Sequence, residues 1–126
     1  MATCTFNTRN GNYSQNAFAL KLNPTGTTLV YSSFLGGYGA AWETGIAVDG
    51  TGRAYLTGVA SNSLCGGGVH TYGAQYECFP TTSDALISDI GGGNSIDMAF
   101  MSVFNSTGTS LVYSTLFGDT PREAYR

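Results

Sequence analysis

The chain has 126 residues, enough for one domain with a single modest core. Only 10% of its residues are charged, and the formal net charge is −3. This balance excludes the basic surface that binds nucleic acid, and no run of about 18 apolar residues predicts a membrane span. Gly, Ser, Thr and Asn supply most of the polar positions, a composition that favours a β-rich exported or cell-surface protein.

Six short segments predict β-strands, and no segment keeps the 3.6-residue apolar period of a helix over three turns. The strands follow one another in three pairs: 17–22 with 28–35, 45–49 with 53–60, and 98–104 with 110–117. A turn that begins with Asn or Asp and ends with Gly separates the members of each pair. The Asx side chain can hydrogen-bond the backbone two residues on, and the glycine can adopt a positive φ. The sequence therefore predicts an all-β chain of three hairpins.

The first and third hairpins repeat one sequence. The segment NPTGTTLVYSSFLGG begins at Asn23, and NSTGTSLVYSTLFGD begins at Asn105, 82 positions later. Aligning Ala17–Gly37 with Ala99–Asp119 gives identical residues at 11 of 21 positions. Shared turn chemistry explains the Asn and Gly residues but not LVYS in both segments. A repeat of strand-rich units is typical of solenoids and propellers.

The second strand of the first hairpin places apolar side chains on both faces. Its residues Leu29, Val30, Tyr31, Phe34 and Leu35 do not alternate with polar ones. A two-layer sandwich leaves one face of each strand in water, whereas stacked propeller blades cover both faces of their middle strands. We therefore expect neighbouring blades to cover both sides of this hairpin. Without them, apolar surface would be left in water at Phe18, Leu20, Val30, Phe34 and Leu35 and at the repeated positions Phe100, Val112, Leu116 and Phe117.

The order of these motifs resembles the bacterial SBBP, or seven-bladed β-propeller, repeat. The family pattern has a hairpin of the type AF.AKLNPTGT.LVYSTYLGG, then GIAVD..GNAYVTG, then FPTT. This chain carries AFALKLNPTGTTLVYSSFLGG, GIAVDGTGRAYLTG and FPTTSDAL, followed by MAFMSVFNSTGTSLVYSTLFGD. The resemblance covers about 80 of the 126 residues.

The resemblance implies four-stranded β-propeller-type blades in an extracellular or cell-surface protein, and it implies no reaction. Residues 1–16 would lead in, 17–38 would form the outer hairpin of a half blade, and 120–126 would begin a further blade. Residues 45–119 would form one full blade with an insertion at 63–78. About one and a half blades need further blades or other copies to cover their open edges. We therefore expect a homo-oligomer or filament, or a longer chain.

The insertion carries two of the three cysteines. A disulfide between Cys65 and Cys78 would staple this glycine-rich segment, which has little core of its own. The alternatives are unpaired thiols or a metal site from Cys65, His70, Glu77 and Cys78, although zinc sites favour closer spacing such as C-x2-C. With that disulfide formed, Cys4 is a free thiol or a bridge to another chain.

The sequence contains no recognisable set of catalytic residues. The single histidine, His70, has no nucleophile motif near it, and the aspartates lack the D-x-D-x-D spacing of a calcium loop. We therefore expect no enzyme activity, no cofactor and no bound metal.

The expected function is a non-enzymatic structural or interaction module that self-assembles through open strand edges. The alternative is a carbohydrate-binding or adhesion module that uses the 63–78 insertion as its recognition loop. Its candidate stacking residues are Trp42, Tyr72 and Tyr76. Burial of Trp42 between blades is an equally good interpretation.

Overall fold

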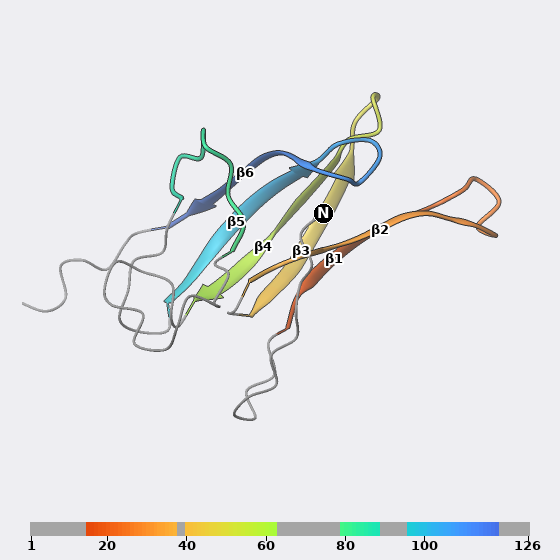
Figure 1. The fold of residues 1–126 in the computed structure, drawn as a ribbon. Helices are drawn as coiled ribbons and strands as arrows, with labels where there is room; N and C mark the ends of the chain where they lie inside the picture. The colour runs from red at the N-terminus through yellow and green to blue at the C-terminus, as the bar shows by residue number, and fades with distance from the viewer. Residues whose placement is uncertain (1–14, 38–39, 63–78, 89–95, 119–126) are drawn as a thin grey trace, which may run out of the picture.

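A computed structural model of the chain describes residues 15–37, 40–62, 79–88 and 96–118. The described residues form an all-β fold with six strands and no helix, and hence none that could span a membrane. The strands are β1 Ala17–Leu22, β2 Leu29–Leu35, β3 Ala41–Val48, β4 Ala54–Asn62, β5 Ile96–Phe104 and β6 Leu111–Phe117 (Figure 1). All six predicted strands are therefore confirmed. The largest difference is at β3, which begins four residues before the predicted start at Gly45.

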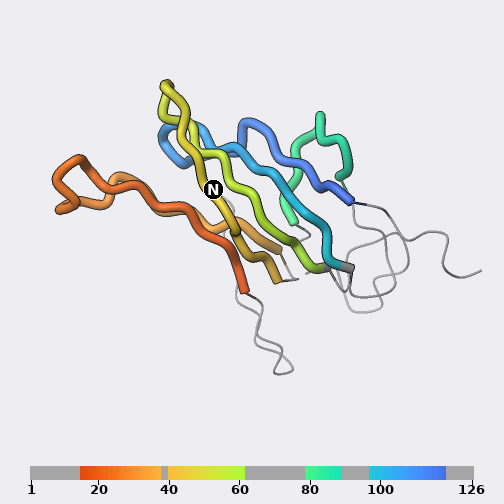
Figure 2. Tube along the Cα trace, turned by 180° about the vertical axis from the view of Figure 1, so that it is seen from behind, coloured from red at the N-terminus to blue at the C-terminus, as the bar shows by residue number. Residues whose placement is uncertain are grey.

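The strands form two antiparallel sheets. One is the β1–β2 hairpin, and the other has the four strands β3-β4-β5-β6 in chain order. The hairpin lies against one face of the four-stranded sheet, and its turn projects beyond that sheet (Figures 1 and 2). The two layers meet where Ala41 N donates to Gln15 O at 2.7 Å.

The β1–β2 and β5–β6 hairpins have the same register. Phe18 pairs with Phe34 in the first hairpin, and the aligned Phe100 pairs with Leu116 in the second. Both hairpins also have a β-bulge at the same aligned position of the first strand. The repeat in the sequence is therefore a repeat in the structure.

The turns that close these hairpins are also alike. Asn23 Oδ1 accepts the backbone N–H of Thr27 at 2.8 Å, and Asn105 Oδ1 accepts that of Thr109 at 2.9 Å. The asparagines thus reach four residues along the chain, not the two that the sequence predicts. The glycine that ends each hairpin turn has a positive φ, with values of 70° at Gly26, 84° at Gly52 and 67° at Gly108.

The amide nitrogen of Asn105 closes its turn from the other side. Its Nδ2 donates to Thr109 Oγ1 at 3.0 Å and to Ser110 Oγ at 2.9 Å. An amide group has two N–H donors, so both are used within the turn.

The core lies between the two layers. The hairpin contributes Ala17, Ala19 and Leu35, whose side chains are almost fully buried. The four-stranded sheet contributes one face, made of Ala41, Ala54, Leu56, Ala60, Met98, Phe100, Phe104 and Leu116. Many of these side chains are alanines, which let the two layers approach closely.

Candidate interaction surface

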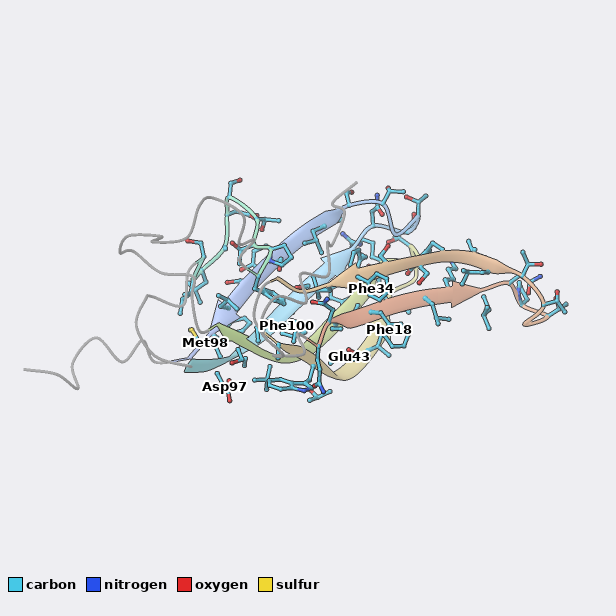
Figure 3. All side chains as sticks on the ribbon, turned by 60° about the horizontal axis from the view of Figure 1, so that its bottom comes forward. Phe18, Phe34, Glu43, Asp97, Met98 and Phe100 are labelled. Carbon is cyan, nitrogen blue, oxygen red and sulfur yellow. The ribbon has the colours of Figure 1, made fainter. Side chains whose placement is uncertain are left out.

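The face of the β1–β2 hairpin that points away from the core is apolar. Side chains alternate along β1, so that Ala17 and Ala19 point inward while Phe18, Leu20 and Leu22 point outward. Each of these three outward side chains is about half exposed, and Phe34 on β2 is 60% exposed. Figure 3 labels Phe18 and Phe34 on the hairpin. We call Phe18, Leu20, Leu22 and Phe34 the outer hairpin face.

This exposure confirms the expectation that Phe18, Leu20 and Phe34 leave apolar surface in water when no neighbouring blade covers them, whereas Leu35, for which the same was expected, is buried. Within the described part of the chain only the inner face of the hairpin is covered, by the four-stranded sheet. Of the two apolar faces of β2, one is therefore covered and the other is exposed. Apolar side chains left in water forgo their transfer free energy, so the outer hairpin face favours contact with another surface.

The aligned positions of the second hairpin are buried instead. Phe100, which aligns with Phe18, is 1% exposed, and Leu116, which aligns with Phe34, is also 1% exposed. Ser102 and Phe104, which align with Leu20 and Leu22, are buried as well. One sequence unit thus occurs twice in this chain, once with its face covered and once with the same face open.

The β1–β2 layer and the segment 79–88 provide the cover in the second hairpin. The ring of Phe79 lies 4.7 Å from the ring of Phe100, and its side chain is buried. Thr82 N donates to Ser114 O at 3.0 Å, and Leu116 N donates to Ile87 O at 3.0 Å. The segment therefore runs along the outer edge of β6, where Figure 1 shows it in green.

Side chains strengthen this attachment. Ser114 Oγ donates to Pro80 O at 2.7 Å, and Thr82 Oγ1 accepts Ser114 N–H at 3.1 Å. Ile87 N donates to Thr115 Oγ1 at 3.1 Å. The hydroxyl groups of β6 thus bind the segment at two points.

The corresponding edge of β2 is open. Because the registers are the same, the backbone N–H and C=O groups of Ser32 and Phe34 point away from β1, as those of Ser114 and Leu116 point away from β5. Among the residues that the structure describes, none hydrogen-bonds these groups from outside the hairpin. An open edge next to an apolar face is a template for strand addition.

Asp49 closes the β3–β4 turn. Its carboxylate accepts hydrogen bonds from Thr51 N at 2.9 Å and from Thr51 Oγ1 and Arg53 Nε at 2.7 Å each. The hydrogen bond from the Thr51 hydroxyl, with further bonds from Arg53 and the Thr51 backbone, holds the pKa of Asp49 well below its ordinary value, although desolvation acts in the opposite direction. The Asp49–Thr51 contact is the predicted Asx bond two residues on. The described residues contain no group of three His, Cys, Asp or Glu side chains that could hold a metal ion.

Most residues of the predicted sites lie outside the described part of the chain. They are Cys4, Cys65, His70, Tyr72, Tyr76, Glu77 and Cys78. The disulfide and the stacking platform therefore stay predictions. Trp42 lies on β3, where its side chain is 41% exposed and its indole Nε1 donates to Gln15 Oε1.

The role of the segment 79–88 is not apparent from the sequence. FPTT is visible as a motif, but it has no strand period, and nothing in the sequence pairs it with β6. The repeat alone does not reveal this role, because the two hairpins share one pattern and, among the described residues, only the second is bonded to such a segment.

No protein-family model matches the chain, and no curated protein and no solved structure matches it significantly. The resemblance to SBBP repeats therefore rests on the motifs quoted from the sequence.

Proposed function

We propose that this chain is a non-enzymatic structural module of an extracellular or cell-surface β-propeller-repeat protein, and that it assembles through its open hairpin. The observation that carries the proposal is the outer hairpin face, whose aligned residues are buried in the second hairpin. Fully burying one large apolar side chain is worth about 1.5–3 kcal/mol, and a whole domain has a net stability of about 5–15 kcal/mol. Covering this face would therefore be a large gain for so small a chain.

The stacking of the layers supports the assignment to a propeller-type repeat. In a propeller, four-stranded antiparallel blades stack face to face. Here a four-stranded antiparallel sheet has a hairpin on one face, and that hairpin repeats its third and fourth strands. This is the arrangement expected of one blade and the outer half of its neighbour.

The same geometry indicates the type of assembly. Inside one chain, the inner hairpin face covers the four-stranded sheet, so the outer hairpin face would receive a sheet from another repeat or another copy. Such a contact joins two different surfaces and is heterologous. It closes into a ring or extends into a filament, depending on the rotation between neighbours.

Sedimentation velocity tests the proposal. We expect species larger than the 13.2 kDa monomer, which dissociate on dilution. The double variant Phe18→Ser/Phe34→Ser should sediment as the monomer, while the control Val48→Ser, at a side chain on β3 that is 64% exposed and lies outside the hairpin and the segment 79–88, should assemble like the wild type. Circular dichroism confirms that each variant is folded. A folded wild-type chain that stays monomeric at high concentration would refute self-assembly.

A further inference from the structure

We infer that the β1–β2 hairpin is a docking site for an extended polypeptide segment with the chemistry of residues 79–88, carried by a partner repeat. Its sequence class is an aromatic residue, proline and two threonines, followed by an aliphatic residue near position 87. The inference rests on the proposed function, because it names the partner that covers the open edge. It goes further by specifying which side chains and backbone groups recognise that partner.

The bound segment on β6 provides the template. Phe79 packs on Phe100, Pro80 O accepts the hydroxyl of Ser114, and the backbone of Thr82 and Ile87 bonds the edge of β6. The attachment thus combines one aromatic contact, one hydroxyl contact and strand-like backbone bonds. This combination selects by sequence as well as by edge pairing.

The β1–β2 hairpin offers the same set of groups. Phe18 matches Phe100, and Ser32 matches Ser114, with identical residue types in the same register. The Ser33 hydroxyl lies at the aligned position of Thr115; it already donates to Gly108 O across the two layers, and its oxygen can still accept a hydrogen bond, as that of Thr115 does. Phe34 takes the place of Leu116, and its backbone N–H points toward the open edge in the same way.

The two hairpins differ in the side chain beside the hydroxyl at the aligned positions Ser114 and Ser32. In the second hairpin the hydroxyl of Ser114 is shared with Ser102, whose Oγ lies 2.7 Å away. Leu20 replaces Ser102 in the first hairpin, so this hydroxyl pair is absent and Ser32 is exposed. The Ser32 hydroxyl can donate to a carbonyl as Ser114 does, and Leu20 adds apolar surface beside it.

The chain's own segment is not the expected occupant. Phe79 is 7% exposed and the segment is bonded to β6 at Ser114, Thr115 and Leu116. Moving it to β2 would expose the edge of β6 in order to cover the edge of β2, with no net gain in stability. The occupant therefore comes from a different repeat unit, and exchange of residues 79–88 between copies is an outcome that the experiment detects.

The test uses the synthetic peptide FPTTSDALIS, capped at both ends, with the ¹⁵N-labelled full chain at a dilution where it is monomeric. We expect chemical-shift changes at Phe18 and at Ser32–Phe34. A peptide with Ala in place of the phenylalanine should bind about tenfold more weakly, because the aromatic contact and its burial are lost. A scrambled peptide is the control for composition.

Two variants of the chain locate the contact. Ser32→Pro removes a backbone N–H that points away from β1, a change that an edge strand tolerates, and it should abolish peptide binding. Ser32→Ala keeps the edge and loses only the hydroxyl, so it should weaken binding less. If Ser32→Pro does not fold, Phe18→Ser, which removes the aromatic platform at a half-exposed position, tests the same site.

The outcomes separate this inference from the proposed function. If the chain assembles but the peptide produces no shifts and does not dissociate the assembly, the docking site is wrong and the proposed function stands. If the chain is monomeric and the peptide binds β1–β2, self-assembly is wrong and the docking site stands. Shifts confined to β6 would show exchange with the chain's own segment and would also overturn the inference.

Discussion

The β1–β2 and β5–β6 hairpins have one sequence pattern, one register and one type of turn, yet they have opposite surroundings. The face that carries Phe100 and Leu116 is buried, while the face that carries Phe18 and Phe34 is about half exposed. Local sequence therefore determines the hairpin itself, and its position in the chain determines what covers it. The second hairpin receives both a neighbouring layer and the segment 79–88.

The comparison predicts very different costs for the same substitution at aligned positions. Phe100→Ala should destabilise the fold by about 3–5 kcal/mol, because it leaves a cavity beside Phe79. Phe18→Ala in the monomer should cost less than about 1 kcal/mol, because much of that side chain already meets water. Urea unfolding of dilute samples measures both values. Equal losses would mean that the outer hairpin face is covered within the monomer.

A second pair of substitutions tests the contact between the layers. A side chain at either Gly26 or Gly108 must adopt a positive φ, at a cost of about 1–2 kcal/mol. A Cβ at Gly108 would also overlap the ring of Tyr31, whereas a Cβ at Gly26 would meet open space.

Gly108→Ala should therefore lower the free energy of unfolding by about 1–3 kcal/mol more than Gly26→Ala does, as measured by thermal or urea unfolding. The double variant Gly108→Ala/Tyr31→Ala should recover part of the difference, because it removes the ring that the new methyl group would overlap. If the two alanine variants are equally stable, the turn of the second hairpin does not press on β2.

The hydroxyl groups supply a smaller contrast. Ser114→Ala removes a buried hydroxyl that bonds Pro80 O and Ser102 Oγ, and we expect a loss of about 1–3 kcal/mol. Ser32→Ala, at the aligned exposed position, should change the free energy of unfolding of the monomer by no more than about 0.5 kcal/mol. Hydrogen exchange should also show faster exchange at Thr82 in Ser114→Ala. Unchanged protection there would contradict the role given to this hydroxyl in holding the segment.

The smallest expected effect concerns the third Asx turn, which uses a carboxylate where the repeated hairpins use asparagine. Because the fold lowers the pKa of Asp49, this group stabilises the native state above its unfolded pKa of about 3.9. That stability is lost as the pH falls through the lower folded value. Asp49→Asn should slightly lower the urea midpoint at pH 7, and the gap to wild type should close in acid. A gap that is constant with pH would exclude the carboxylate charge as its cause.

The hairpins could be predicted from the sequence because their determinants are local. Asn23 and Gly26 mark a turn, and the apolar segments beside it mark the strands. The repeat then predicted a second hairpin of the same kind at Asn105, and the structure confirms both.

The cover of each hairpin could not be predicted in the same way. The bond between Thr82 and Ser114 joins residues 32 positions apart, and no periodicity in either segment indicates it. The pattern of β2 indicates that both of its faces are stabilised by burial against other protein surfaces. It does not specify whether those surfaces belong to the same chain. The exposure of Phe34 was predicted from the absence of neighbouring blades, whereas the same prediction for Phe100 and Leu116 was wrong, because the first hairpin and the segment 79–88 cover them.

The turn at Asn105 has a practical consequence for producing this protein. Asn105-Ser-Thr107 matches the acceptor sequence for N-linked sugar, whereas the aligned Asn23-Pro-Thr25 does not, because proline follows the asparagine. Both donors of the Asn105 amide are used inside the folded turn, so attaching a glycan there would break at least one of these bonds. A eukaryotic secretory host could modify this residue before the turn closes. A bacterial host avoids that competition and leaves the turn intact.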